Sequence, residues 1–261
     1  MRFLRTLLIE LKRAVLSYRF AAAVLIMLAG LIAGGFEHIY GFMKGLSSTP
    51  PDALRAGMES MCFSWAVGSD AAHFVLPIAA ALPCSVLFID DMTSGFIKGY
   101  VSKTGRAAYI AVRGIVSLVV PALAVALGMM ILYAALYFIL SPYCPPGEGG
   151  SSVLTGLVGQ LKIVAPYAAG ASLWSSVGLL LAGATVNGFS AIASPFIIFY
   201  LMEIAFTRYF PKASQFAPSM LLSGGELIEN PMTLLITSLA LSAALIGAFS
   251  AVSYSRIRRQ I

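Results

Sequence analysis

One segment of this sequence, residues 89–109, places two acids, three bases and three glycines between apolar runs, and it reads IDDMTSGFIKGYVSKTGRAAY. The segment begins with the paired acids Asp90 and Asp91, and bases follow them at Lys98 and Arg106. Long apolar runs precede and follow it. The chemistry that such a segment suits is charge-assisted docking, so the elements around it must hold it at a surface.

The segment also has a helical pattern. Apolar side chains recur at i, i+4, i+8 and i+9, at positions Met92, Phe96, Tyr100 and Val101. This spacing predicts a short helix with one apolar face. The paired acids precede it, where negative charge suits a helix N-terminus, and Thr93 and Ser94 offer hydroxyl groups for capping. Gly99 and Gly105 allow breaks. We therefore expect a short amphipathic docking helix.

Other kinds of chemistry lack their motifs in this sequence. It contains no G-x-S-x-G or H-E-x-x-H hydrolase motif and no G-x-x-x-x-G-K-[ST] phosphate-binding loop. The two histidines, His38 and His73, have no partner ligands at the spacing of a zinc site. We therefore do not expect an enzyme, and we expect no metal or cofactor bound by this chain itself.

Three ionisable residues fall within or beside apolar runs, where a charge costs at least about 2.5–3.5 kcal/mol on insertion scales. Glu203 lies past the middle of the run 189–207. It either lines a translocation path or a subunit interface, or it reaches water or a base such as Arg208. Asp70 and His73 are three positions apart and can share a helix face. We favour an interfacial pair over a proton relay, which would need more inward-facing acids or histidines.

The composition predicts the elements that carry these residues. The hydrophobic fraction is 59% and the charged fraction 11%, against roughly 45–50% and about 25% in soluble domains. A helix needs about 20 residues to cross the hydrocarbon core. Apolar runs suited to this recur at 20–36, 71–89, 114–140, 163–186, 189–207 and 232–254. We therefore expect an all-α membrane protein with six transmembrane helices in a single domain, residues 1–261.

The distribution of bases predicts the orientation of these helices. Lys and Arg in short loops are retained on the cytoplasmic side. Most of the 17 bases lie before the first run, between the second and third, or after the sixth. We therefore expect a multi-pass protein of the cell membrane with both termini cytoplasmic. The net charge of +6 points to anionic lipid headgroups as the partner of these bases, and not to nucleic acid.

Residues 2–18 predict a basic amphipathic helix. At about 100° per residue, one half of such a helix is apolar. The other half carries Arg2, Arg5, Glu10, Lys12, Arg13 and the adjoining Arg19. A helix of this kind lies in the membrane interface. It either anchors the first span in its orientation or also docks a cytoplasmic protein.

Two features belong to the expected outer loops. Cys62 and Cys144 would both lie outside, where a disulfide between them is one option, whereas Cys84 falls within the second run. The connection 208–231 is rich in apolar residues that would form an exposed patch if they faced water. We expect short re-entrant or capping helices there, before the last span.

The docking segment resembles a motif of ABC-2-type transporter permeases, which are the membrane subunits of ATP-driven exporters. In that family the motif reads D/E-x-x-x-G-[TF]-[IL]-K, followed by two further bases. The matching residues here are Asp91, Gly95, Phe96, Ile97, Lys98, Arg106 and Arg113. The layout is similar as well, with an interfacial N-terminal helix, six spans and the motif between spans two and three. Two positions differ, because the family often has Lys at Arg113 and a longer polar residue at Gly99.

The resemblance implies a coupling role for this segment and for the N-terminal helix. Both would sit against a separate ATPase subunit, present in two copies, which binds the ATP and Mg. The residues that it assigns to coupling are Asp90, Asp91, Gly95, Phe96, Lys98, Tyr100, Arg106 and Arg113. Of these, Asp91 and Lys98 would orient the coupling helix, and Arg106 and Arg113 would tie its exit to headgroups or to ATPase acids. A purely topological role for the bases stays open.

The resemblance also implies a second membrane subunit, a copy of this chain, and a hydrophobic or amphipathic substrate. A peptide is the first expectation, ahead of a lipid-linked glycan or a small drug. The alternative from another class is a self-contained secondary carrier or channel that uses Glu203 and the Asp70–His73 pair. Such a carrier would work without ATP, and it would usually show internal repeats, which the two halves of this sequence do not display.

Overall fold

The computed structural model describes residues 2–46, 58–140, 153–223 and 231–260, and these residues form helices joined by short turns. The α-helices are α1 (Arg2–Val15), α2 (Tyr18–Leu46), α3 (Met58–Val67), α4 (Asp70–Thr93), α5 (Phe96–Thr104), α6 (Arg106–Leu140), α7 (Val153–Thr185), α8 (Gly188–Ile204), α9 (Pro218–Ser223) and α10 (Pro231–Gln260). A π-helical turn, Ala205–Tyr209, and a 3-10 helix, Pro211–Phe216, connect α8 to α9.

Six of these helices are long and apolar enough to cross a membrane, namely α2, α4, α6, α7, α8 with its π-helical turn, and α10. The chain is therefore an all-α, multi-pass membrane protein, as predicted. Several helices extend past the predicted runs. The helix α2 continues to Leu46, and α6 begins at Arg106, because polar residues beyond the hydrocarbon edge do not interrupt backbone hydrogen bonding. The helix α3, which the sequence did not predict, packs against α2, where the rings of Trp65 and His38 lie 5.0 Å apart.

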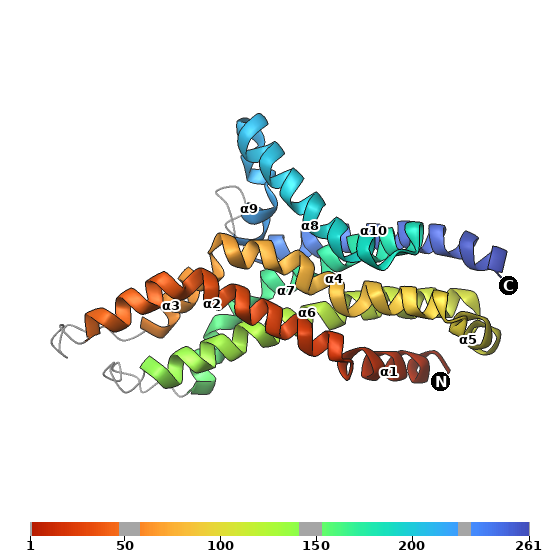
Figure 1. Cartoon of the computed structure of the whole chain (residues 1–261), viewed down its shortest axis with the longest axis horizontal. Helices are drawn as coiled ribbons and strands as arrows, with labels where there is room; N and C mark the ends of the chain where they lie inside the picture. The colour runs from red at the N-terminus through yellow and green to blue at the C-terminus, as the bar shows by residue number, and fades with distance from the viewer. Residues whose placement is uncertain (1, 47–57, 141–152, 224–230, 261) are drawn as a thin grey trace.

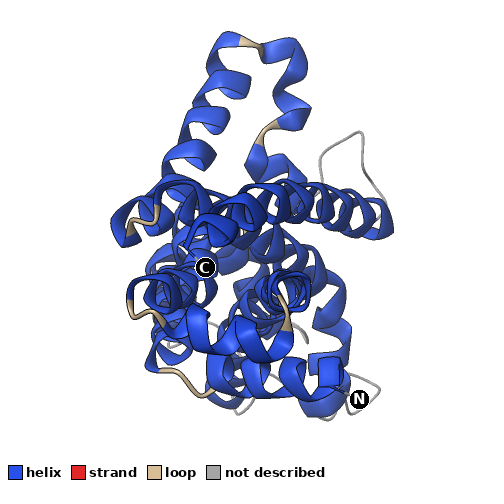
Figure 2. Cartoon of the chain, turned by 90° about the vertical axis from the view of Figure 1, so that its right-hand side faces the viewer, coloured by secondary structure: helices blue, strands red, loops and turns tan. Residues whose placement is uncertain are grey.

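Apart from α8, the long helices run roughly along the long axis of the molecule (Figure 1). The helices α1 and α5 and both chain termini lie at one end, which we call the α5 end, and α3 lies at the other. Both termini lie at the α5 end, and the cytoplasmic orientation of that end stays a prediction. Figure 2 shows that α8 leaves the bundle and that the chain returns through a hairpin to α9. The 3-10 helix and α9 are the short capping helices expected before the last span.

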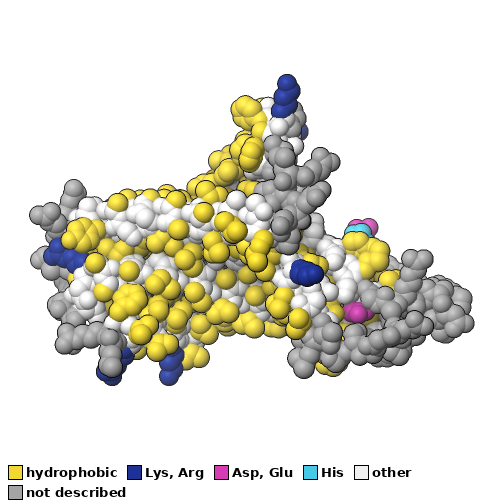
Figure 3. Space-filling view, turned by 180° about the vertical axis from the view of Figure 1, so that it is seen from behind, with side chains coloured by type: hydrophobic (Ala, Val, Ile, Leu, Met, Phe, Trp, Pro, Cys, Tyr) yellow, Lys and Arg dark blue, Asp and Glu magenta, His cyan; other side chains and the backbone are white. Residues whose placement is uncertain are grey.

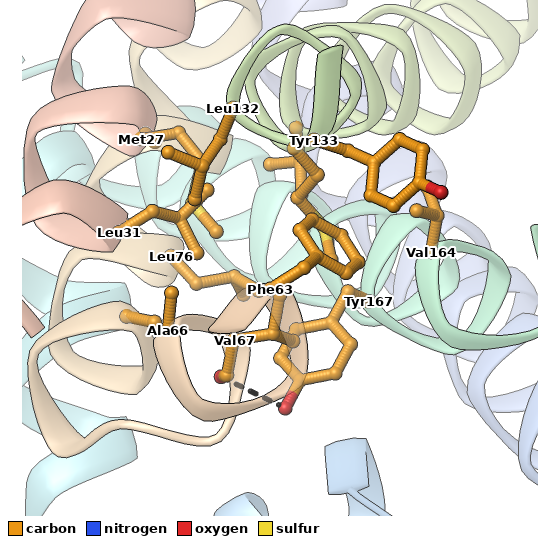
Figure 4. Packing of buried hydrophobic residues seen from close by; sticks show 14 of the residues in the cluster. Met27, Leu31, Phe63, Ala66, Val67, Leu76, Leu132, Tyr133, Val164 and Tyr167 are labelled. Carbon is orange, nitrogen blue, oxygen red and sulfur yellow. Dashed lines mark hydrogen bonds between the residues drawn. The ribbon is translucent and has the colours of Figure 1, made fainter. Parts of the chain in front are cut away.

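A buried core joins α3 to the bundle near the end opposite α5 (Figure 4). Phe63 of α3 packs edge-on against Tyr133 of α6, with ring centroids 5.5 Å apart. The hydroxyl of Tyr167 on α7 donates to the carbonyl of Val67 at 3.2 Å. This contact satisfies a carbonyl at the C-terminal end of α3 that no further turn of helix would reach.

The cysteines leave one prediction open. Cys62 is buried in α3 and Cys84 in α4. The proposed partner of Cys62, Cys144, lies outside the described residues, so the disulfide stays a prediction.

Candidate functional site

The predicted docking helix is present as α5, which lies between α4 and α6. Glycines separate it from both neighbours, because Gly95 has φ = 72° and Gly105 has φ = 86°. Only glycine adopts these left-handed conformations without a steric cost. Ile97 and Val101, one turn apart, are buried in an apolar cluster that includes residues of α4 and α6. The helix is thus attached to the end of the bundle by an apolar face.

That apolar face differs from the prediction in its residues. Met92 belongs to the last turn of α4, because the break at Gly95 separates it from α5. Ile97 takes its place in the buried face, while Phe96 remains 43% exposed. Phe96 and Tyr100 do share a face, as predicted, with ring centroids 5.2 Å apart. This aromatic pair forms the outward part of α5.

The paired acids also lie in a different place from the one predicted. Asp90 and Asp91 do not begin the docking helix, because both belong to the last turns of α4. Asp91 is fully buried. The acids lie on the helix before the predicted one, because α4 continues past its apolar run to Thr93. The acids therefore act from the helix that precedes α5, and their partners lie on other helices.

Asp91 is part of a buried group of charges that we call the ion cluster, which consists of Glu10, Arg13, Asp91, Tyr109 and Arg113. The guanidinium of Arg113 donates to Asp91 Oδ2, and its Nη2 lies 3.3 Å from Glu10 Oε2. The side chains of Glu10, Asp91 and Arg113 are only 1–2% exposed. Tyr109, one turn before Arg113 on α6, donates its hydroxyl to Asp91 Oδ2 at 3.1 Å. The cluster therefore joins α1, α4 and α6.

The helix α1 contributes a second base to the ion cluster. Arg13 Nη2 lies 2.9 Å from Asp91 Oδ1 and its Nη1 lies 3.9 Å from Glu10 Oε1. The same guanidinium stands 5.0 Å from the centroid of the Phe96 ring, a distance at which the cation is attracted to the aromatic face. Arg13 therefore links the buried carboxylates to the outward face of α5.

These positions correct two expectations about charged residues. Arg113 was expected to face headgroups or ATPase acids, but it is buried and paired within the chain, so it cannot touch a partner protein. Glu10 was assigned to the polar half of the N-terminal helix, whereas it faces inward and is 1% exposed. Both predictions fail for the same reason. Arg113 and Glu10 pair with each other, and this pairing allows both charges to be buried.

A second ion pair ties α2 to the end of α4. Arg19 Nη2 donates to Asp90 Oδ2 at 2.6 Å. Asp90 is about half exposed, so this pair lies at the rim of the site. The two predicted coupling acids thus have separate partners on separate helices.

The remaining predicted site residues lie around this centre. Arg5 and Lys12 of α1 are exposed, and Arg106, the first residue of α6, is half-buried. The side chains of Lys98 and Arg2 lie outside the described residues, although both positions belong to helices. Figure 3 shows basic side chains at the α5 end, beside a broad belt of apolar and uncharged side chains. This distribution suits a membrane-embedded belt with a basic end.

Tyr100 connects the outward face of α5 to the ion cluster. Burial and the nearby Glu10 carboxylate raise the pKa of Tyr100 to about 12. The tyrosine is therefore neutral at physiological pH, and its hydroxyl can donate a hydrogen bond.

Two residues of the predicted translocation path, Asp70 and His73, lie in the first turns of α4, and the third, Glu203, lies at the end of α8. Asp70 is exposed at the start of α4, and His73 is buried with Nε2 3.1 Å from the hydroxyl of Tyr167. Glu203 accepts hydrogen bonds from the backbone N–H and the hydroxyl of Ser219, at 3.0 and 2.6 Å. Glu203 therefore holds the start of α9.

Two members of the ion cluster, Glu10 and Tyr109, were missing from the predicted site. A signal for Glu10 does exist, because it is the only acid of α1 and stands between Ile9 and Leu11. Arg113 lies in the apolar string AVRGIV, and a buried arginine requires an acid. Nothing in the sequence identifies Tyr109 as the further partner, since that depends on how α4 and α6 pack.

The ion cluster can hold three helices together, but it does not resemble a catalytic centre or a metal site. Among the described residues, no group of three His, Cys, Asp or Glu side chains could bind a metal ion. Comparison with known protein families, with characterised proteins and with solved structures found no match for this chain. A functional assignment therefore depends on the geometry of the site and on the motif in the sequence.

Proposed function

We propose that this chain is the membrane-spanning subunit of an ATP-driven exporter of the ABC-2 type, with α5 as its coupling helix. The observation that carries the proposal is the position of α5. It is a short helix at the end of the bundle, fastened by Ile97 and Val101 and bounded by two left-handed glycines, with the Phe96 ring left outside. An exposed aromatic side chain on a rigid helix suits insertion into a pocket of another protein.

The surroundings of α5 support the same role. The helix connects directly to two membrane-spanning helices, α4 and α6, and its Phe96 ring contacts Arg13 of α1. A force applied to α5 would therefore reach several spans through packed contacts, which is how rigid-body switching is transmitted. The α5 end is cytoplasmic in this proposal, because it carries most of the bases.

The proposed complex contains two copies of this chain and two copies of a separate ATPase subunit, which supplies the ATP and Mg. The substrate is a hydrophobic or amphipathic molecule, with a peptide as the first candidate, and it would pass between the two membrane subunits. In this proposal Glu203 keeps α9 in place and has no ion-coupling function. The secondary-carrier alternative would instead require the Asp70, His73 and Glu203 group to drive transport in this chain alone.

The proposal predicts that a neighbouring reading frame encodes an ATP-binding-cassette protein. The experiment that tests it is co-expression of that protein with this chain, followed by purification through a tag on this chain. We expect the two to co-purify, and we expect Phe96→Asp to abolish that association. The matched control is Phe189→Asp. Phe189 is 80% exposed and follows the α7–α8 turn. This turn lies near the α5 end, since Gly183 of α7 accepts a hydrogen bond from Arg256, close to the C-terminus.

Two outcomes would contradict the proposal. One is an adjacent ATPase that does not associate with the wild-type chain in any membrane preparation. The other is an association that Phe96→Asp and Phe189→Asp weaken equally, because a specific role for α5 would then be lost.

A further inference from the structure

The helix α1 is fastened to the bundle more firmly than an interfacial anchor requires. An amphipathic anchor needs only an apolar face in the lipid and bases near the headgroups. The exposed leucines Leu4 and Leu8, with Arg5 and Lys12 beside them, supply both. Yet α1 also buries a carboxylate, Glu10, against α6. The lipid anchor does not account for this residue.

The helix α1 supplies one buried partner to each charge that the bundle contributes to the ion cluster. Asp91 and Arg113 of the bundle balance each other, and Glu10 and Arg13 of α1 add one charge of each sign. Each base contacts both acids. If α1 moved away, Arg113 would lose Glu10 and Asp91 would lose Arg13, so each would keep only the other as its partner. Because charges this deeply buried must be paired, a displacement of α1 disrupts the pairing of Asp91 as well.

Asp91 lies only four residues before Gly95, where the chain turns into α5. Arg13 stands over the Phe96 ring on the far side of that turn. The Glu10 carboxylate contributes to the raised pKa of the Tyr100 hydroxyl. The helix α1 therefore contacts both ends of the connection between α4 and α5. These contacts are independent of the apolar anchoring of Ile97 and Val101.

We propose that Glu10 is a positioning residue that locks α1 to the α4–α5 junction through the Arg113 that it shares with Asp91, so that α1 and α5 move as one unit. The lock is a property of this chain and needs no partner. Its consequence for export, that the docking surface consists of two helices that respond together, rests on the proposed function.

The lock is tested by measuring the distance between α1 and α5 in lipid nanodiscs without any ATPase. Spin labels are placed at Leu8→Cys, which is 66% exposed, and at Gly99→Cys, where an added Cβ atom meets no other atom within 4 Å. The native cysteines are replaced by serine. We expect a narrow distribution of distances for the otherwise unchanged chain, and a distribution about twofold broader for Glu10→Gln, because neutral glutamine binds Arg113 more weakly than a carboxylate does.

Two further variants separate a charge effect from a loss of shape. Glu10→Asp keeps the charge on a shorter side chain, and we expect it to restore most of the narrow distribution. Arg5→Gln is the matched control, since it removes a charge from the exposed side of the same helix. We expect its distribution to equal that of the unchanged chain. If Glu10→Gln leaves the distribution as narrow as Arg5→Gln does, the lock does not exist.

A second pair of labels guards against a loss of fold. Leu25→Cys on α2 and Leu239→Cys on α10 are exposed positions within the spans, and their distance should not respond to Glu10→Gln. If it broadens as well, the deciding variant is Arg13→Gln, which alters a side chain that is 38% exposed. For that variant we expect an intermediate broadening of the distance distribution between α1 and α5. An unchanged distribution would overturn the proposal. A positive distance result with no ATPase association would leave the lock in place and remove the proposed function.

Discussion

Arg113 is the central residue of the site, because its guanidinium is shared by carboxylates from two other helices. Removing such a charge from water is expensive, and opposite charges with good geometry must offset the cost. Arginine suits this position better than lysine, since its planar group can serve two acids at once.

Replacing Arg113 should therefore destabilise the fold in a graded way. Arg113→Gln leaves two buried carboxylates with Arg13 as their remaining base, and we expect a loss of about 3–5 kcal/mol in the free energy of unfolding. Arg113→Lys should lose less, because it keeps the charge without the fork. The midpoint of thermal unfolding in detergent, followed by the fluorescence of the buried Trp174, checks this order.

Arg106→Gln is the control for that series, because Arg106 is half-buried and lies two turns earlier on the same helix. We expect a change within about 0.5 kcal/mol. Equal effects of the two glutamine variants would mean that the ion cluster does not contribute specially to stability.

Part of this site could be predicted at the level of single residues. The motif directed attention to Asp91, Phe96 and Arg113, and the structure brings all three to the α5 end. Their partners could not be predicted, because Glu10 and Arg113 are far apart in sequence and meet only when α1 packs against α6. Burial of a charge depends on that packing, and helical periodicity alone placed Glu10 on the wrong side.

At the level of elements, α5 is defined by its glycines as much as by its apolar face. The predicted helix was correct in kind, but its boundaries were not, because apolar spacing continues from Met92 into α5 across the break at Gly95. A left-handed glycine interrupts a helix without interrupting a pattern of hydrophobic residues. The predicted break at Gly105 is confirmed, whereas Gly99 lies inside the helix.

Substitutions at two glycines should therefore have opposite effects. Gly99 lies inside α5 with open space around it, and Gly99→Ala should stabilise the helix by about 1 kcal/mol. Gly95 has φ = 72°, and Gly95→Ala should cost about 1–2 kcal/mol. Unfolding midpoints of the two variants, measured side by side, check the signs. A stabilising Gly95→Ala would contradict the assigned turn.

The short helix α9 depends on Glu203. The carboxylate uses one oxygen for the backbone N–H of Ser219 and the other for its hydroxyl. Glu203→Gln keeps one acceptor and Glu203→Ala keeps none, so the amide of Ser219 should exchange with solvent faster in that order. Hydrogen exchange of the peptide that covers α9 measures this. Thr237→Val on α10 is the control and should leave exchange at α9 unchanged, since its hydroxyl bonds within its own helix.

At the scale of the whole molecule, composition and hydropathy predicted the six spans, and the structure confirms them as membrane-length helices. Their lengths were less predictable, because α2 and α6 continue where the sequence becomes polar. The helix α3 was missed, since its ten residues are too few for a span and its apolar side chains show little helical periodicity. The slant of α8 away from the bundle (Figure 2) also has no signal in its apolar sequence.

The proposed function treats the molecule as one half of a switch, with the spans in the membrane and the α1–α5 unit at the surface where energy enters. Two helices locked together can pass a displacement to α2, α4 and α6 at once, because each of these is connected to them by the chain or by the ion cluster. A carrier that works alone does not require a docking surface of this kind. The central claim is therefore that transport by this chain depends on an ATPase.

The most direct measurement of that claim is the rate of ATP hydrolysis by the adjacent ATP-binding-cassette protein in liposomes, with and without this chain. We predict that the chain raises the rate several-fold in the manner of a coupled subunit, that Phe96→Asp abolishes the increase, and that Phe189→Asp preserves it. A rate that is the same in liposomes with and without this chain would contradict the account.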